Sequence, residues 1–329
     1  MNTPRTLTVT STALAALALA ACSAGGPDSA DEDGTTTVTV AAVGIMSDVT
    51  LDIATEQGFF AEEGIEIEIS QVAAPPAGLA ALQGGQVDIA FSPGVVFANA
   101  RAQDIPVVIV AGASGFPADV PPGPELDLYD DTGVYVDPSS GFTSLADLEG
   151  ATIAVNARKA NLEATASQAL RNAGVDLSTI EWVALDFTSM IESLTSGQVD
   201  AAVPVNPFTL QAEEAGMERI ASPAPEFFGD GASSFWLTSS QIAEEKSEVV
   251  TSFQAAIHKA NAYANEHLDE SIAAGVEIAG LDVAVEDAGK IYWPLEVTQQ
   301  DVEVIGDNLV ELDFLDAPVD MTDVILPGA

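Results

Sequence analysis

Short runs of apolar residues alternate with longer stretches of helical periodicity along most of the 329-residue chain. Short runs that are apolar throughout are typical of strands covered on both faces by helices, as in parallel sheets. Glycines close many of the helical stretches, because glycine readily adopts the left-handed conformation that ends a helix. The pattern therefore predicts an α/β fold. The expected strands are 38–43, 65–69, 89–91, 105–111, 133–136, 151–156, 182–185, 201–203 and 233–238, and the expected helices are 51–57, 95–103, 144–149, 162–173, 243–268, 268–279 and 298–309.

One helix-to-strand unit occurs twice in the chain. LAALQGGQVDIAFSPGVVF, residues 79–97, is matched by IESLTSGQVDAAVPVNPF, residues 191–208, and both contain GQVD. In each unit a glycine ends a helix, a buried strand follows, and a turn with proline ends the strand. Ligands of open parallel sheets bind just beyond the carboxyl ends of the strands. The repeat predicts two lobes whose strand ends face a shared cleft, although two ordinary connections without a ligand would give the same pattern.

The order of the elements predicts a discontinuous first lobe. A proline-rich, acidic segment at 114–132 separates the first group of strands from a short strand that would open the second lobe. The strand at 233–238 would lead back. We therefore expect residues 38–132 and 238–329 to form the first lobe and residues 133–237 to form the second.

Residues 1–22 resemble the signal peptide of a bacterial lipoprotein. The apolar stretch 12–21 is too short to span a bilayer, and it ends in Leu-Ala-Ala-Cys at 19–22, which resembles a lipobox. A plain secretory peptide with an incidental cysteine is the alternative. The resemblance implies that Cys22 is lipidated and anchors the protein to the outer face of the cell membrane. Residues 23–37, rich in Gly, Ser, Asp and Thr, would form a flexible tether.

The charge and cysteine content exclude several functions. Fifty-one acidic against nine basic residues give a formal net charge of −42, which is unsuited to nucleic acid. Cys22 is the only cysteine, so the chain has no thiol for an intrachain disulfide, for catalysis or for a cysteine-based metal site. The sequence also lacks HExxH, CxxC and glycine-rich phosphate motifs, and we expect neither cofactor nor metal.

A further stretch carries a family resemblance. Residues 56–65, EQGFFAEEGI, look like the E-x-G-F-F-x-x-x-G-(I/L) signature of extracytoplasmic solute-binding proteins of the nitrate/sulfonate/taurine type, which are related to binders of thiamine-precursor pyrimidines. The GQVD units and residues 145–154, LADLEGATIA, also resemble segments of that family. The resemblance implies a type II periplasmic-binding-protein fold, in which each lobe is a mostly parallel sheet flanked by helices and two crossing strands join the lobes. It further implies a monomer that closes on a small molecule and delivers it to an ABC permease in the membrane.

The strand ends and the cleft loops of the family indicate the same candidate site, apart from the stretch at 235–236, which rests on the resemblance alone. One departure is Asn206, which stands where the family often has the Glu of Glu-Pro-Phe and which leaves the binding of a ligand cation in doubt. The candidate ligand-binding residues are Met46, Ser47, Asp48, Ser92, Pro93, Gly94, Asn156, Arg158, Asn206, Phe208 and Trp236.

These candidates leave the chemistry of the ligand open. Arg158, with Lys159, follows a strand and precedes a helix, an arrangement that can clamp a carboxylate, sulfonate or phosphate, or that can be a solvated pair beside local acids. Phe208 and Trp236 would stack on a ring or belong to the core. Ser92 is equally suited to capping the helix that follows it, and for Asp48 the capping of the helix near Val49 is favoured over ligand contact.

Two other classes of function compete with a transport receptor. A surface lipoprotein that senses a solute or adheres to a partner would carry the same lobes. An enzyme of the pyrimidine-synthesis type shares the fold but needs histidine chemistry in the cleft. The chain has only His258 and His267, both in the long helix predicted near its end. We therefore expect that the protein is not an enzyme.

Overall fold

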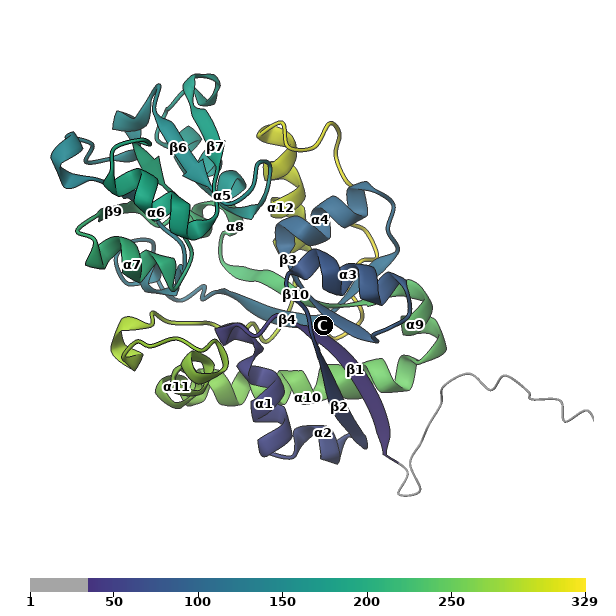
Figure 1. The fold of residues 1–329 in the computed structure, drawn as a ribbon. Helices are drawn as coiled ribbons and strands as arrows, with labels where there is room; N and C mark the ends of the chain where they lie inside the picture. The colour runs from purple at the N-terminus through teal and green to yellow at the C-terminus, as the bar shows by residue number, and fades with distance from the viewer. Residues whose placement is uncertain (1–34) are drawn as a thin grey trace, which may run out of the picture.

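The structure is a computed structural model that describes residues 35–329, and these residues form two lobes (Figure 1). The first lobe contains a five-stranded sheet in the order β2-β1-β3-β10-β4. Only β10 runs against the other strands, since it pairs antiparallel with both β3 and β4, while β1 pairs in parallel with β2 and β3. The strands are β1 (Thr36–Ala42), β2 (Ile65–Gln71), β3 (Ile89–Pro93), β4 (Val107–Phe116) and β10 (Gly231–Ser239).

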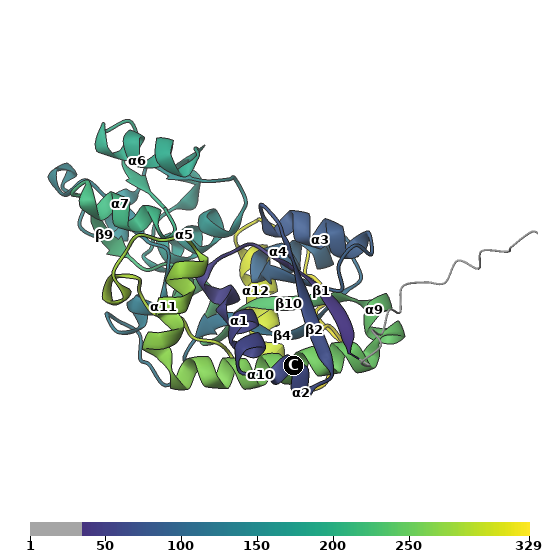
Figure 2. The ribbon, with the colours of Figure 1, turned by 60° about the horizontal axis from the view of Figure 1, so that its bottom comes forward.

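Helices cover both faces of this sheet, and successive residues of β10 enter opposite layers. Phe235 packs against Phe97 on one face, and Trp236 packs against Phe253 on the other. The helices α1 (Val49–Glu56), α2 (Phe59–Glu62) and α10 (Ser247–Glu266) lie on the Trp236 side; α3 (Pro75–Gln83), α4 (Gly94–Ala102) and α12 (Gln299–Glu311) lie on the Phe235 side. Two further helices, α9 (Ser240–Glu245) and α11 (Leu268–Ile278), precede and follow α10 in the chain. Figure 2 shows α10 running beneath the sheet.

The second lobe repeats this plan with shorter elements. Its sheet has the order β7-β6-β8-β5-β9, and only β5 runs against the other strands. The strands are β5 (Val134–Val136), β6 (Thr152–Val155), β7 (Glu181–Ala184), β8 (Ala201–Ala202) and β9 (Glu218–Ala221). The helices are α5 (Asn161–Asn172) on one face and α6 (Phe187–Thr195) and α7 (Phe208–Glu214) on the other.

Short 3-10 turns and one short helix connect these elements. The 3-10 turns are η1 (Met46–Asp48), η2 (Leu126–Tyr129), η3 (Pro138–Ser140), η4 (Leu145–Leu148), η5 (Leu177–Thr179) and η6 (Val285–Asp287), and the helix is α8 (Ala224–Phe228).

The two sheets confirm the predicted α/β architecture of two lobes, each with a mostly parallel sheet. In each sheet the single antiparallel strand is the first strand that the chain forms after it crosses from the other lobe.

One predicted boundary between the lobes is corrected. The sequence assigns residues up to 237 to the second lobe, but β10 fills the gap between β3 and β4 along residues 231–239. Residues 231–237 therefore belong to the first lobe, because only there does the strand find hydrogen-bonding partners on both edges.

The GQVD repeat has a structural explanation in both lobes. Gly85 and Gly197 have φ angles of 64° and 69°, so each ends its helix in the left-handed conformation. The Asp88 carboxylate accepts a hydrogen bond from the backbone N–H of Thr39 at 3.0 Å, and Asp200 accepts one from Thr152 at 2.8 Å. Each aspartate thus fixes its strand against the neighbouring parallel strand near the amino ends of the strands. The GQVD residues of both units therefore align strands and do not line the cavity between the lobes.

The lobes also touch around the two crossing segments, which are residues 117–133 between β4 and β5 and residues 222–230 between β9 and β10. Helix α8 packs against α5 of the second lobe and α12 of the first. Two cations of the second lobe reach the end of α12 and the loop that follows it. Lys159 Nζ donates to the carbonyl oxygen of Asp313 at 2.9 Å, and Arg171 Nη1 lies 2.9 Å from a carboxylate oxygen of Glu311, the last residue of α12. These contacts join the lobes on the side where Figure 1 shows α5 and α12 as neighbours.

Among residues 35–329, no helix is long and apolar enough to cross a membrane. The predicted signal peptide, Cys22 and most of the predicted tether lie outside the described residues.

Candidate functional site

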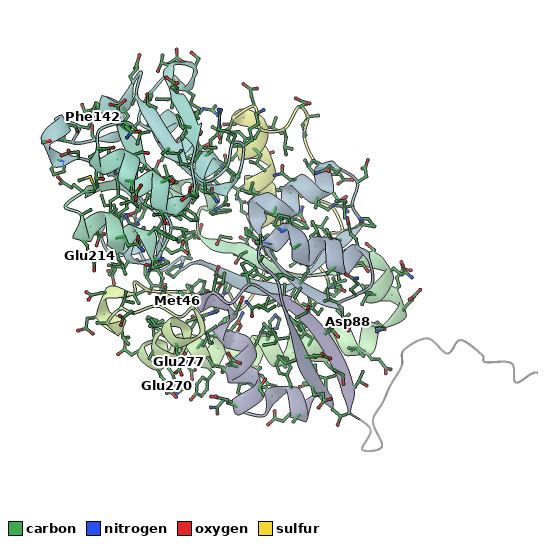
Figure 3. The ribbon with its side chains drawn as sticks, in the orientation of Figure 1. Met46, Asp88, Phe142, Glu214, Glu270 and Glu277 are labelled. Atoms are coloured by element: carbon green, nitrogen blue, oxygen red, sulfur yellow. The ribbon has the colours of Figure 1, made fainter. Side chains whose placement is uncertain are left out.

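A cavity of about 490 Å³ lies between the two lobes. Residues from both sheets, from the first crossing segment and from the loop after α11 surround it. Figure 3 shows Met46 near this junction, with Glu214 on the second lobe and Glu277 on α11 around it, while Asp88 lies toward the far side of the first lobe. The lining residues are 44–47, 114–116, 128–131, 135, 205–207, 209, 210, 213, 219, 233, 279, 281 and 286–291.

The first lobe contributes the loop that follows β1. Asp48 Oδ2 accepts hydrogen bonds from the backbone N–H groups of Val43, Gly44 and Ile45, at 3.1, 2.8 and 3.3 Å, and so fixes the shape of this loop. Asp48 is only 4% exposed, and its second oxygen has no partner among the described residues. Burial raises the pKa of Asp48 to about 6, even though the three N–H groups favour the ionised form.

The second lobe contributes the turn that follows β8. The backbone N–H of Asn206 donates to the carbonyl oxygen of Asp131 at 2.8 Å, which holds this turn against the first crossing segment. The side-chain amide of Asn206 donates to the carbonyl oxygen of Ala288 at 3.1 Å. Since Ala288 belongs to the first lobe, Asn206 connects the lobes across the cavity.

A buried carboxylate ties the two crossing segments together. Asp130, on the first segment, accepts hydrogen bonds from the N–H and hydroxyl of Thr132 and from the N–H of Ala224 on the second segment, at 2.9, 2.7 and 2.8 Å. Burial raises the pKa of Asp130, although these hydrogen bonds and Arg219 oppose the shift. Arg219, on the edge strand β9 of the second sheet, donates to the carbonyl oxygens of Asp130 and Thr132. The segments between the lobes are therefore held by a shared polar network.

Residues 279–291, the bridging loop, cover the cavity from the first lobe. Met46 packs with Ile272 and Val276 of α11 and with Ala288 of this loop, and the Lys290 N–H donates to the carbonyl oxygen of Leu128 at 2.7 Å. Just beyond the loop, the buried Trp293 donates its indole N–H to the carbonyl oxygen of Ser47 at 3.3 Å. The loop is thus anchored to both the first lobe and the first crossing segment.

The polar lining of the cavity is mostly acidic. Five carboxylates and two cations line it: Asp130, Asp131, Glu213, Glu286 and Asp287, with Arg219 and Lys290. The Tyr135 hydroxyl donates to Glu213 at 2.7 Å, and burial followed by this hydrogen bond raises the pKa of Tyr135. Nowhere in residues 35–329 do three His, Cys, Asp or Glu side chains gather in a way that would hold a metal ion.

Three of the predicted site residues line the cavity, namely Met46, Ser47 and Asn206. They follow β1 and β8, one strand in each lobe, as the strand-end argument expects. The other candidates do not line it. Asp48 lies next to the cavity, but its carboxylate turns back onto its own loop.

The predicted anion clamp is occupied by a carboxylate of the protein itself. Arg158 Nε and Nη2 donate to the two oxygens of Glu163 at 2.8 and 3.3 Å, and the Glu163 side chain is only 4% exposed. The backbone N–H of Lys159 also donates to Glu163, at 2.7 Å. The donors that precede α5 thus bind Glu163, a residue in the first turn of the same helix. The arginine belongs to an intramolecular ion pair, the alternative that the sequence leaves open.

The two predicted aromatic contacts also belong to packing. Trp236 is fully buried, with Phe91 and Phe253 at its ring, and Phe208 stacks on Phe187 with ring centroids 4.7 Å apart. A side chain in the middle of β10 faces a helical layer, and so it enters the core.

The carboxyl end of β3 is closed by other elements. The Ser92 hydroxyl donates to the carbonyl oxygen of Pro93, and a Cβ on Gly94 would lie 2.5 Å from Ile305 and 3.3 Å from Phe228. Helices α8 and α12 therefore cover this strand end. Asn156, after β6, is exposed outside the cavity.

The profile of the NMT1/THI5-like family matches residues 49–115 and 129–271. Since these ranges cover more than half of the sequence, the chain belongs to the NMT1/THI5-like family. No curated protein sequence matches it.

Solved structures share the fold. The aliphatic sulphonate binding protein SsuA of Escherichia coli is 19% identical, with a TM-score of 0.68, over 88% of this chain and 97% of its own. The alkanesulfonate-binding SsuA of Xanthomonas axonopodis pv. citri, solved with MOPS, is 17% identical, with a TM-score of 0.66 and the same coverage. The desulfurization enzyme DszB is 16% identical, with a TM-score of 0.64, over 88% and 96% of the two chains. The chain therefore has the two-lobe periplasmic-binding-protein fold, which binding proteins and an enzyme share.

The sequence reasoning missed most of the polar lining. Tyr129, Asp130 and Asp131 lie in the proline-rich, acidic segment at 114–132, in which the sequence predicts no binding residue, and Arg219 and Lys290 are not among the predicted site residues. An aromatic residue and two acids beside a predicted crossing between lobes were the available signal. Any cleft between two lobes is bordered by the segments that join them, so these positions were accessible to the same argument that selected the strand ends.

Proposed function

We propose that this protein is the extracytoplasmic receptor of an ABC importer, which captures a small molecule between its lobes and delivers it to a permease. The observation that carries the proposal is the cavity of about 490 Å³ that both lobes line. Small-molecule sites have volumes of roughly 300–1,000 Å³ and lie preferentially between domains. The family membership and the two sulfonate-binding neighbours, which share the fold, support a receptor.

The contacts around the cavity suit a receptor that closes on its ligand. Both the Asn206 turn and the bridging loop would contact a bound molecule, and the Asn206 amide already joins the lobes. A ligand that contacts both lobes binds the closed form more tightly than the open form, and this differential affinity shifts the population toward closure.

The remaining parts of the proposal concern the location of the receptor. Lipidation of Cys22 would anchor it to the outer face of the cell membrane, and residues 23–37 would give the lobes freedom to reach the permease. We propose that a monomer does this work, since a single chain supplies both walls of the cavity.

Binding without catalysis is the favoured activity. The fold alone does not separate receptor from enzyme, because DszB shares it. Both histidines lie outside the cavity: His267, between α10 and α11, stacks on Tyr263 with ring centroids 4.0 Å apart, and burial lowers the pKa of His258 in α10. The lining therefore offers carboxylates and aromatic rings for contact, with neither histidine near the bound molecule.

A pair of matched substitutions tests the receptor. Leu128 and Ile69 are both exposed aliphatic residues, at 48% and 43%, but only Leu128 lines the cavity. Native mass spectrometry of the chain from Ser23 onward, which keeps every described residue, should detect a copurifying small molecule. Leu128→Trp fills the cavity and should abolish this binding, whereas Ile69→Trp should retain it.

Two further results complete the test. Scattering should show a smaller radius of gyration with ligand than without it, and cells lacking the protein should lose uptake of that ligand. Binding that survives in Leu128→Trp would place the site elsewhere and overturn the proposal. Binding and closure without any effect on uptake would favour the sensing function over transport.

A further inference from the structure

The cavity has an exposed apolar part. Only four large hydrophobic side chains are strongly exposed among residues 35–329, and two of them, Ile45 at 38% and Leu128 at 48%, line the cavity. Tyr129, next to Leu128, is partly exposed and also lines it. Apolar surface left open inside a concave site is typical of a place where an apolar part of a ligand binds. This part of the cavity therefore suits a hydrocarbon or aromatic group.

The cations of the cavity are poorly placed to hold an anion. Arg219 uses its donors on the carbonyl oxygens of Asp130 and Thr132 and lies 4.0 Å from the Asp130 carboxylate. Its Nε is buried beside Gly133 and has no hydrogen-bond partner among the described residues. The charge of Arg219 is therefore already balanced by the protein.

Lys290 is the second cation of the lining. Its Nζ lies 5.5 Å from the centre of the Tyr129 ring, where the face of the aromatic ring attracts it. Apart from the Arg219–Asp130 pair, one lysine stands beside four lining carboxylates, so the cavity is negative in sum. A sulfonate or carboxylate ligand would be repelled by this lining.

The carboxylates, in contrast, are open to a partner. Asp131 is exposed to solvent within the cavity, and within the described chain its carboxylate forms no ion pair and no hydrogen bond with another residue. Burial of the carboxylate among the surrounding atoms, followed by the charge of Asp130, raises the pKa of Asp131 to about 6, although the charge of Arg219 opposes the shift. A positive group at this position would therefore relieve an unfavourable charge.

Glu213 is held in place for a similar contact. One of its oxygens accepts the hydrogen bond of the Tyr135 hydroxyl, and Tyr135 is itself fully buried in the second lobe. The Glu213 side chain is exposed on the cavity side of α7, with its other oxygen available. Asp131 and Glu213 together supply the negative charge that Asn206 lacks relative to the glutamate frequent in the family.

We propose that the cavity selects a small ligand with an apolar or aromatic body and a protonated amine, which the carboxylates of Asp131 and Glu213 hold. This inference rests on the proposed receptor function and specifies its ligand class. Charge-assisted hydrogen bonds to carboxylates are roughly twice as strong as neutral ones, so the amine provides orientation as well as affinity.

Matched pairs of probes test the sign of the ligand charge. Calorimetry of the chain from Ser23 onward would compare benzyl-, 2-phenylethyl- and cyclohexylmethyl-ammonium with the sulfonates of the same three bodies. We expect the ammonium member of a pair to bind at least tenfold more tightly than the sulfonate. Asp131→Asn should weaken ammonium binding about tenfold or more, which corresponds to about 1.4 kcal/mol, and Glu213→Gln should act in the same direction.

The control is Glu68→Gln, which removes one carboxylate from the exposed face of β2, outside the cavity, and should leave affinity unchanged. Asp131→Asn should not lower the thermal stability of the free protein at neutral pH, because the raised pKa of Asp131 means that its charge is unfavourable in the folded chain. Sulfonates that bind as tightly as the ammonium probes would overturn the inference and leave the receptor function intact. Failure of all six probes would also overturn this ligand class, while the Leu128→Trp experiment decides separately whether the cavity binds any ligand.

Discussion

The side-chain amide of Asn206 donates a hydrogen bond to the carbonyl oxygen of Ala288, 3.1 Å away, and so joins the second lobe to the bridging loop of the first. These residues lie 82 positions apart, on opposite walls of the cavity. A hydrogen bond that spans the lobes forms only while the lobes are close together. It therefore stabilises the closed form relative to an open one.

Asn206→Ala should shift the protein toward the open form. The loss of one hydrogen bond costs roughly 0.5–1.5 kcal/mol, so affinity for an ammonium probe should fall by about twofold to twelvefold. Scattering without ligand should give a larger radius of gyration. Gln103→Ala, which removes an amide bonded only within α4, is the control. Equal radii and affinities in the two variants would show that the Asn206 contact does not govern closure.

The elements were largely predictable because their signals are local. Gly85 and Gly197 end helices through their own φ angles, and the buried runs that follow them form β3 and β8. The alternation at Ile65–Ile69 predicts β2, although Ile69 is 43% exposed because β2 is an edge strand. The sequence missed β9 and α8, which are four and five residues long and carry weak periodic signals.

The site was less predictable, because openness of a strand end depends on distant residues. Met46 and Asn206 follow strands whose ends remain open, but Gly94 is covered by Phe228 and Ile305, more than 130 positions away. Trp236 likewise enters the core because Phe253 and Phe91 lie on its side of the sheet. A pattern of residues along one strand does not show which helix will pack over its end.

Arg158→Ala should lower stability without changing ligand affinity. The substitution removes two hydrogen bonds from the buried carboxylate of Glu163 and leaves it the Lys159 N–H. We expect a loss of about 1–2 kcal/mol in the free energy of unfolding, because the buried charge of Glu163 loses its ion-pair partner. The loss stays this small because the Arg158 side chain is half-exposed, so water can reach the carboxylate from that side. Urea unfolding and calorimetry with the ammonium probes measure the two effects.

The control for this variant is Arg171→Ala, which breaks an ion pair exposed on both sides. Exposed ion pairs contribute roughly 0–1 kcal/mol to stability, so Arg171→Ala should be more stable than Arg158→Ala. A large loss of affinity in Arg158→Ala, with unchanged stability, would return Arg158 to the role of a ligand clamp.

Asp48→Asn should alter how stability depends on pH. The pKa of Asp48 is raised to about 6 in the folded protein by burial, against 3.8 as its usual value. The stability contributed by the protonated group is therefore complete below about pH 4 and is lost as the pH rises through 6. The nearby Asp52 carboxylate acts in the same direction. An asparagine carries no such penalty at neutral pH and can still accept hydrogen bonds from the loop.

The measurement is the difference in unfolding free energy between Asp48→Asn and the parent protein at pH 4 and pH 7.5. This difference should move in favour of the variant by up to about 3 kcal/mol as the pH rises. Asp307→Asn, on the exposed face of α12, should show no such change. A pH-independent difference for Asp48→Asn would mean that Asp48 titrates alike in the folded and unfolded states.

Gly115→Ala should destabilise the junction where β4 and β10 leave the first sheet. A Cβ at Gly115 would overlap the carbonyl oxygen of Gly231 and approach Ala232 Cα to 3.0 Å, and neither backbone can move without breaking the pairing of the two strands. We expect a loss of at least about 2 kcal/mol in urea unfolding, as for other overpacked sites. Gly84→Ala is the matched control, because its φ of −78° suits alanine and the nearest atom is 3.4 Å away. There the smaller entropy of the unfolded chain should raise stability by about 0.4–1 kcal/mol, so the two substitutions should have opposite signs. A stable Gly115→Ala variant would show that the two strands separate at low cost.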